Sequence, residues 1–389
     1  MKVLRVAALA LAVAVVLTGC TAAPPAPTQT PRPAAPPIDP VQQYADDRLS
    51  VMTLDEKILS MLMIHLGGYD AAAMGSMVAA NQLGGLILMS DNIPNPPDAL
   101  ASMTPLLSAE SGLPILVATD QEGGYVARIP DPYPGAEQLR GLPPSASHDA
   151  FADRGALLQG VGISVNFGIV ADVTADPSSF IYDRSLGGTA EDAAARVAQA
   201  VEGESGEVLS TLKHFPGHGV SPGDSHSSIP TTAITLTDWR AGHALPFEAG
   251  IDAGAELVMF GHLQFDAVDP QPATLSPLWH EVLRDELGFD GIVITDDMNM
   301  LENSGRPDLA DQASNAVRAV AAGNTMLLYV GSVDIPRIVG AIHNAVVAGD
   351  IPMATIDDAA RRLLVLRRTL SGETGRFSHC LESCQGIIE

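Results

Sequence analysis

The sequence predicts an α/β fold, a single (β/α)8 barrel of the TIM type in which eight parallel strands alternate with helices. Eight short apolar segments alternate with amphipathic segments over roughly 330 residues, which is the element order of such a barrel. Polar residues also gather where the apolar segments end. The eight segments are MLMIHLGG, GGLILMSD, PILVATDQEGG, GISVNFGIVADV, VLSTLKHF, AELVMFGH, DGIVITDD and TMLLYVG.

The strands and helices of this barrel have local signals. Most of the apolar segments are continuously hydrophobic, which is typical of strands that a parallel sheet buries on both faces. The helix expected over residues 189–205 begins at Thr189, an N-cap residue that acidic residues follow. A doubly wound open sheet is the alternative fold, but no glycine-rich phosphate-binding motif follows the first apolar segment, which disfavours it.

The N-terminus carries a targeting signal. Lys2 and Arg5 stand at the start of an apolar run, residues 6–17, that is too short to cross a bilayer comfortably. This pattern predicts a secretory signal peptide over residues 1–19.

Cys20 follows Thr18 and Gly19, and this triplet resembles a bacterial lipoprotein box. The resemblance implies cleavage before Cys20 and a lipid on its sulfur, and an ordinary signal peptide is the alternative. Residues 20–40 are rich in proline and alanine and are expected to form an extended spacer after the lipidated cysteine. The protein is therefore expected outside the cytoplasm as a lipoprotein, in contact with the membrane through its anchor only.

The net charge of the chain indicates which classes of binding partner are disfavoured. Asp and Glu number 46 against 21 Lys and Arg, which gives a formal charge of −25. A surface of this sign argues against nucleic acid and against electrostatic docking on anionic lipid. Hydrophobic residues make up 46% of the chain, enough for residues 41–370 to form one domain with a sizeable core.

Residues 371–389 follow the last expected helix as a C-terminal tail. Cys380 and Cys384 lie in this tail, and a disulfide between them is permitted outside the cytoplasm, with two free thiols as the alternative. Together with His379 they are also possible metal ligands, but no fourth ligand is evident in the sequence.

Six polar residues stand at the C-terminal ends of five predicted strands. In a (β/α)8 barrel these ends converge on the face where active sites are found, so a shared pocket is expected. Because strand side chains alternate in direction, only one of the adjacent carboxylates Asp296 and Asp297 can face the barrel axis. An inward carboxylate must be paired or used, as a nucleophile, a base or a metal ligand. The six residues are Asp120, Asp172, Lys213, His214, His262 and Asp296.

Residues 212–226, LKHFPGHGVSPGDSH, hold three histidines, a lysine and an aspartate. His214 and His218 have the spacing of helical zinc ligands, but a proline and a glycine between them break the helix that this geometry needs. Asp224 and His226 form an Asp-x-His pair, in which the carboxylate fixes the tautomer of the imidazole and raises its basicity. This pair predicts a proton shuttle, and a solvated loop histidine is the alternative.

These motifs together resemble the bacterial β-N-acetylglucosaminidases of glycoside hydrolase family 3. The resemblance spans about residues 51–370 and rests on many segments. It implies a single catalytic barrel and no metal or organic cofactor. The segments are MTLDEKILSMLMIHLGG, ATDQEGGYVARI, NFGIVADV, YDRSLGG, KHFPGHG with DSH, and PATLSPLWHEVLRDELGFDGIVITDDMNM.

The resemblance implies a role for each candidate residue. Asp296 attacks the anomeric carbon, and His226 acts as general acid and base with Asp224 as its partner. Arg184 is expected near the N-acetyl group or on the nucleophile side of the pocket, and His218 shapes the loop. The hydroxyls of the non-reducing-end sugar are bound by Asp120, Arg128, Lys213 and His214.

The expected activity is that of a retaining exo-β-N-acetylglucosaminidase acting on peptidoglycan fragments, as a monomer. A family 3 β-glycosidase and a β-N-acetylglucosaminide phosphorylase are alternatives within the same chemistry. A non-catalytic sugar-binding lipoprotein is the alternative from a different class. Tyr125 stands where the family commonly has an arginine, so the leaving-group preference stays open.

Overall fold

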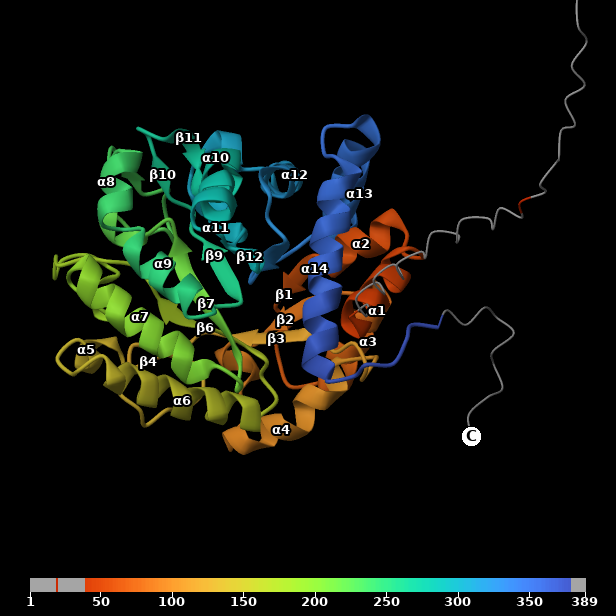
Figure 1. Ribbon diagram of the computed structural model, residues 1–389, viewed down its shortest axis with the longest axis horizontal. Helices are drawn as coiled ribbons and strands as arrows, with labels where there is room; N and C mark the ends of the chain where they lie inside the picture. The colour runs from red at the N-terminus through yellow and green to blue at the C-terminus, as the bar shows by residue number, and fades with distance from the viewer. Residues whose placement is uncertain (1–18, 20–38, 379–389) are drawn as a thin grey trace, which may run out of the picture. The chain divides into compact units, whose positions relative to one another are not determined.

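The computed structural model describes Gly19 and residues 39–378, and these contain a closed barrel of eight parallel strands (Figure 1). The strands follow one another around the barrel in the order β1-β13-β12-β9-β7-β6-β3-β2. Each of the eight predicted segments supplies one strand of the barrel, so the (β/α)8 prediction is confirmed and the open sheet is ruled out. The strands are β1 (Leu62–Ile64), β2 (Gly85–Ile87), β3 (Leu116–Thr119), β6 (Val165–Val170), β7 (Leu209–Phe215), β9 (Leu257–Phe260), β12 (Ile292–Asp297) and β13 (Met326–Tyr329).

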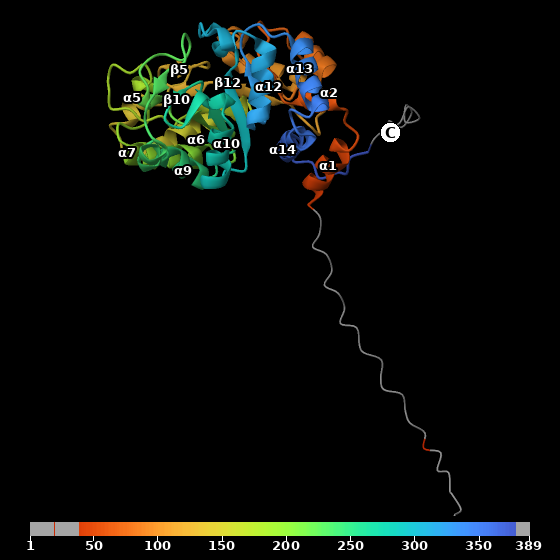
Figure 2. The same cartoon turned by 90° about the horizontal axis from the view of Figure 1, so that it is seen from above.

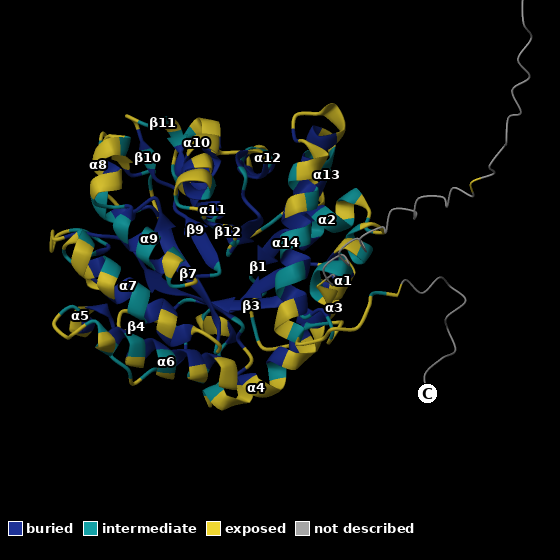
Figure 3. Cartoon of the chain, viewed as in Figure 1, coloured by how far each residue is buried: buried dark blue, intermediate teal, exposed yellow. Residues whose placement is uncertain are grey.

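Helices surround the strands, with their inner faces buried and their outer faces exposed (Figure 3). The longer helices are α1 (Pro40–Leu49), α2 (Leu54–Ser60), α3 (Ala71–Asn81), α6 (Ser145–Gly160), α7 (Ala190–Glu204), α9 (Leu245–Asp252), α12 (Gln312–Ala322), α13 (Ile335–Ala348) and α14 (Met353–Ser371). The shorter ones are α4 (Leu100–Met103), α5 (Ala136–Leu139), α8 (Leu236–Ala241), α10 (Pro277–Glu281) and α11 (Asn299–Asn303). The first and last helices, α1 and α14, pack side by side (Figure 2).

Two helix starts show why the chain turns into helix where it does. The hydroxyl of Thr189 accepts a hydrogen bond from the N–H of Asp192 at 3.2 Å, which confirms Thr189 as the N-cap of α7. At the start of α2, Thr53 and Glu56 form a reciprocal capping box. Each cap satisfies backbone donors that the first helical turn leaves free, and stabilises the helix by about 1 kcal/mol.

Aromatic packing fixes β7, the strand that carries two of the candidate residues. Phe215, at the end of β7, packs edge-on against Trp239, Phe247 and Trp279, with ring centroids 5.2 to 5.9 Å apart. The indole N–H of Trp239 donates to the carbonyl oxygen of Pro216 at 2.6 Å. The end of β7 and the first residue of the loop that follows are therefore anchored in the core.

Short strands extend the loops at the C-terminal end of the barrel. β4 (Gln121–Gly123) and β5 (Val126–Ala127) form an antiparallel hairpin directly after β3. A second small sheet, with strand order β11-β10-β8, lies in the loops after β7 and β9. Its strands are β8 (Thr231–Thr232), β10 (Gln264–Phe265) and β11 (Asp269–Pro272).

Several sequence predictions concern residues outside this description. Cys20, Cys380 and Cys384 lie outside the described residues, as do the apolar run of the signal peptide and most of the spacer. The carboxylate of Asp39 accepts from the N–H of Val41 at 2.8 Å and caps α1, so helix begins at the end of the expected spacer. Over residues 39–378, none of the helices has the length and apolar character needed to cross a membrane.

Candidate active site

A cleft of about 610 Å³ opens at the C-terminal ends of the barrel strands. Its lining includes every candidate catalytic and binding residue of the sequence analysis. The eight are Asp120, Arg128, Arg184, Lys213, His214, Asp224, His226 and Asp296. Asp172 and His262, the other two strand-end residues, are fully buried behind this lining.

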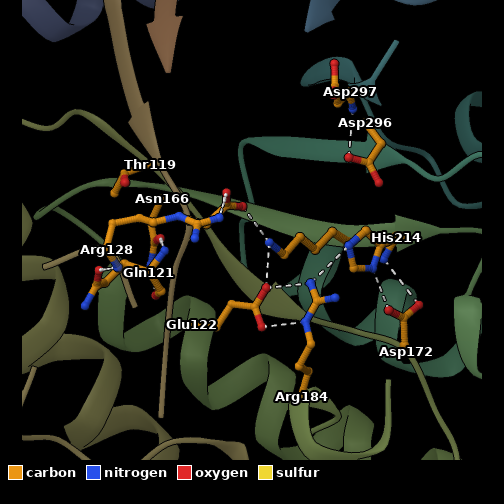
Figure 4. Close-up of polar contacts among 12 residues, drawn as sticks. Thr119, Gln121, Glu122, Arg128, Asn166, Asp172, Arg184, His214, Asp296 and Asp297 are labelled. Carbon is orange, nitrogen blue, oxygen red and sulfur yellow. Dashed lines mark hydrogen bonds and ion pairs between the residues drawn. The ribbon is translucent and has the colours of Figure 1, made fainter. Parts of the chain in front are cut away.

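A cluster of paired charges occupies one side of the cleft. Lys213 is only 2% exposed, and its Nζ lies 2.9 Å from Oδ1 of Asp120 and 2.7 Å from Oε1 of Glu122. Arg128 donates to Oδ2 of Asp120 at 3.1 Å. Arg184, at the end of the 3-10 helix Tyr182–Arg184, donates twice to Glu122 at 2.7 and 2.9 Å (Figure 4). Each buried charge is thus paired with an opposite one.

These pairs keep the cluster ionised. Burial by itself would raise the pKa of Asp120, but the charges of Lys213 and Arg128 outweigh it and lower that pKa to about 2. Burial also opposes ionisation of Glu122, and Lys213 and Arg184 lower its pKa below the ordinary value. The two carboxylates in turn raise the pKa of Lys213 against the effect of burial. The cluster therefore presents fixed charges that can bind hydroxyl groups, not groups that exchange protons near neutral pH.

His214 is oriented by a carboxylate from the segment that follows the neighbouring strand, β6. Its Nδ1 lies 2.7 Å from Oδ2 of Asp172, which leaves Nε2 to accept from Arg184 at 3.3 Å (Figure 4). Oδ1 of Asp172 accepts from the backbone N–H groups of His214 and His218, at 3.2 and 2.5 Å. Burial would raise the pKa of Asp172, but His214 lowers that pKa by more than burial raises it, so the carboxylate stays charged. Asp172 thus holds both the ring and the backbone at the end of β7.

Asp296 is the next-to-last residue of β12 and lies on the other side of the cleft. Its Oδ1 accepts from the N–H of Asp297 at 2.8 Å. Burial would raise the pKa of Asp296, but the nearby His214 and His262, with this backbone N–H, bring it below the ordinary value. Asp296 is therefore ionised at neutral pH, as a nucleophile requires.

Asp297 has a different environment from its neighbour. Its Oδ1 accepts from the backbone N–H groups of Asn299 and Val330, at 3.1 and 2.9 Å. Burial raises the pKa of Asp297 to about 6. His262 contacts the same turn, and its Nε2 lies 2.9 Å from the carbonyl oxygen of Asp297. Asp297 and His262 hold the backbone that presents Asp296.

The predicted Asp-x-His pair is formed. Nδ1 of His226 lies 2.6 Å from Oδ1 of Asp224, which also accepts the backbone N–H of His226 at 3.0 Å. Burial would raise the pKa of Asp224, but these contacts lower it below the ordinary value. The His226 side chain is 64% exposed. Its ring lies edge-on to Phe180, with centroids 5.9 Å apart. An exposed imidazole with one nitrogen held by a carboxylate is suited to proton transfer.

His218 lies apart from this pair. It is 1% exposed, and its ring packs edge-on against Phe180 with centroids 4.4 Å apart. Burial lowers its pKa to about 4, so the ring is neutral at physiological pH. Over the described part of the chain, no three His, Cys, Asp or Glu side chains are grouped so that they could hold a metal ion.

Three residues that the structure places at the site have no role predicted from the sequence. Glu122 is two positions after Asp120, and side chains at i and i+2 of a strand share a face, so this spacing was a usable signal. Asp172 was recognised as a strand-end residue, but its partner His214 comes from another strand. Phe180, which contacts His218 and His226, lies in a loop with no sequence signal.

Comparison with known proteins identifies the family. The model of the glycosyl hydrolase family 3 N terminal domain matches residues 53–366. The beta-hexosaminidase LpqI of Mycobacterium tuberculosis is 30% identical over 360 residues, covering 86% of this chain and 89% of that protein. A beta-hexosaminidase of Pseudomonas aeruginosa is 32% identical over 275 residues, covering 68% of this chain and 80% of that protein.

Solved structures agree. The family 3 beta-N-acetylglucosaminidase from Paenibacillus sp. str. FPU-7 has a TM-score of 0.74 at 30% identity, covering 87% of this chain and 66% of that longer chain. M. tuberculosis LpqI has a TM-score of 0.72 at 28% identity, covering 82% of this chain and 95% of that chain. The chain therefore belongs to glycosyl hydrolase family 3 and is a glycoside hydrolase.

Proposed function

We propose that the protein is a retaining exo-β-N-acetylglucosaminidase that releases non-reducing-end N-acetylglucosamine from peptidoglycan fragments. The observation that carries this proposal is that one cleft contains the ionised carboxylate of Asp296 and the Asp224–His226 pair. The names of the similar beta-hexosaminidases and of the Paenibacillus beta-N-acetylglucosaminidase support the choice of sugar.

In the first step, Asp296 attacks the anomeric carbon as the bond to the leaving oxygen breaks. Protonated His226 gives its proton to that oxygen, while Asp224 stabilises the imidazolium before transfer. In the second step, neutral His226 takes a proton from water, and the water oxygen displaces the Asp296 carboxylate. Two inversions at the anomeric carbon give net retention.

The paired charges supply binding for the sugar in this scheme. Asp120 and Glu122 accept hydrogen bonds, and Lys213, Arg128 and Arg184 donate them, so hydroxyl groups can bind without a change of protonation. Charge-assisted hydrogen bonds of this kind are about twice as strong as neutral ones. An N-acetylglucosamine with free hydroxyls at its non-reducing end satisfies such a cluster, which favours exo cleavage.

An aryl N-acetyl-β-glucosaminide tests the activity. We expect the wild-type protein to release the phenol, and Asp296→Asn to lose about 10⁴-fold or more in kcat. Asp308→Asn is a matched control, because this carboxylate is exposed and pairs with Arg306 outside the cleft. Absence of release by the wild-type protein would contradict the proposal, as would full activity of Asp296→Asn. Comparison with an aryl β-glucoside, which lacks the acetamide, measures how much the acetamide contributes to kcat/KM.

Phosphorolysis is a second candidate, favoured because the acid–base group is a histidine, which carries no negative charge in either protonation state. A histidine repels an incoming phosphate less than a carboxylate would. The same assay in phosphate buffer decides between the two acceptors. Formation of N-acetylglucosamine-1-phosphate supports phosphorolysis, and free N-acetylglucosamine alone supports hydrolysis.

We also propose that the protein is a lipoprotein anchored outside the cytoplasm through Cys20. The signal-like residues 1–19 and the lipoprotein-box resemblance support this location. Expression of the full chain should place the protein in the membrane fraction, and Cys20→Ala should release it. A membrane fraction unchanged by Cys20→Ala would contradict lipid anchoring at this residue.

A further inference from the structure

We propose that Gln121 is a positioning residue that fixes the sugar-binding side chains in and next to the β4–β5 hairpin. The proposal rests on the proposed function, because it concerns how Asp120, Glu122 and Arg128 meet the sugar. Gln121 lies between two of these residues in the chain, but it does not line the cleft. It acts through them and has no contact with the substrate.

The side chain of Gln121 is fully buried, and all its polar atoms are used. Oε1 accepts from the backbone N–H groups of Arg128 and Ile129, at 2.9 and 3.0 Å. Nε2 donates to the carbonyl oxygen of Ile129 at 2.8 Å and to Oδ2 of Asp131 at 3.1 Å. One amide group therefore ties the start of the hairpin to the segment that leaves it.

The backbone of Gln121 is tied to the barrel by Asn166 of β6 (Figure 4). The N–H of Gln121 donates to Oδ1 of Asn166 at 3.1 Å, and the carbonyl oxygen of Gln121 accepts from Nδ2 at 3.0 Å. Asn166 is itself fully buried and donates to Glu204 of α7. The hairpin thus has a fixed attachment to the adjacent strand.

Asp131, the other partner of the Gln121 amide, is held by a second buried group. Its Oδ2 accepts from Nε of Arg154 at 2.6 Å, and both side chains are fully buried. The guanidinium of Arg154 lies directly under Gly123, where an added Cβ would come within 2.0 Å of Nη2. Only glycine at position 123 leaves room for the hairpin to pack against the Arg154 guanidinium.

The consequence is that one buried amide sets the positions of three cleft residues. Asp120 and Glu122 flank Gln121 in the chain, and the backbone of Arg128 is bonded to its Oε1. Loss of these bonds allows the three side chains to shift together. A misplacement of about 1 Å in a binding group costs about 100-fold in rate.

Gln121→Met tests this, because methionine has a similar length but cannot make the four side-chain hydrogen bonds. Gln312→Met is the matched control, since Gln312 is a largely buried glutamine whose amide bonds Glu302, Ser332 and Asp334 away from the cleft. We expect both variants to melt at a lower temperature. We expect only Gln121→Met to lose about 100-fold in kcat/KM.

A double-mutant cycle separates positioning from general destabilisation. In an Arg128→Ala background, Gln121→Met should cost about 10-fold or less, because one of the groups that it positions is already absent. The same 100-fold loss in both backgrounds would overturn the proposal, as would a kcat/KM of Gln121→Met within about 3-fold of the wild type. Kinetics are measured on whichever of a panel of aryl β-glycosides the wild-type protein cleaves best. Cleavage of only a glucoside would contradict the proposed function, and the Gln121 test would proceed on that glucoside.

Discussion

Replacing Lys213 with methionine perturbs the charge balance beneath the cleft. The Lys213 ammonium is almost fully buried and pairs with both Asp120 and Glu122. Methionine keeps most of the side-chain volume, but it leaves each carboxylate with one cation in place of two. Asp120 retains Arg128, and Glu122 retains Arg184.

The magnitude follows from these contacts. Removing one partner of a buried ion pair costs about 3–5 kcal/mol, and the remaining cations place the expected cost near the lower limit, about 3 kcal/mol. Burial then dominates, so the pKa of each carboxyl rises in the variant. Carboxyls with lowered folded-state pKa values stabilise the wild type above their unfolded values and lose that contribution as pH falls. Because the pKa values of these carboxyls are higher in the variant, its carboxyls take up protons before those of the wild type as pH falls. The deficit of Lys213→Met should therefore be largest near pH 7 and shrink below about pH 4, as pH approaches the wild-type Asp120 pKa of about 2.

Urea unfolding of both proteins at several pH values measures this deficit. Lys57→Met is the control, because the Lys57–Asp357 pair is partly exposed, with side-chain exposures of 14% and 39%. Its loss should cost less than about 1 kcal/mol. A Lys213→Met deficit below about 1 kcal/mol at pH 7, or one as large at about pH 3 as at pH 7, would contradict this prediction.

Two other substitutions address the loop and a buried carboxyl. Phe180→Ala removes the ring that contacts His226 and His218, and should lower kcat about 10-fold for aryl glycosides whose leaving group needs protonation. Dinitrophenyl glycosides, whose leaving group needs no acid, should be affected little, and equal losses for both classes would argue against this role. Burial raises the pKa of Glu204 from the ordinary 4.5 to about 8, so the folded state loses stability as pH rises between these values. Glu204→Gln should flatten the dependence of Tm on pH between 5 and 8, and superimposable wild-type and variant curves would contradict this.

The barrel strands could be predicted because burial on both faces gives each of them a continuous apolar run. The small strands could not, since they are two to four residues long and carry no periodic pattern. The β4–β5 hairpin is also held by side chains from elsewhere, such as Asn166 and Arg154, which lie far along the chain. No local sequence signal contains that information.

The candidate site, like the fold, could be predicted from the sequence only in part. The C-terminal ends of parallel strands meet on one face of the barrel, so the sequence predicted that Asp120, Lys213 and Asp296 lie on that face. The positions of the strand ends do not predict which charges pair, since pairing depends on side chains from different strands and loops. Arg184 was expected near the N-acetyl group or the nucleophile side of the pocket, and in the structure it bonds Glu122 and lies beside His214.

The proposed mechanism requires Asp296 as the nucleophile and His226 as the acid and base. His226→Gly, given a 2,4-dinitrophenyl N-acetyl-β-glucosaminide, should complete the first step without an acid and stall before the second. Mass spectrometry of the intact protein should then show an added N-acetylglucosaminyl group, and peptide mapping should place it on Asp296. An adduct on another residue, or phenol release at the wild-type steady rate with no adduct, would contradict the central claim.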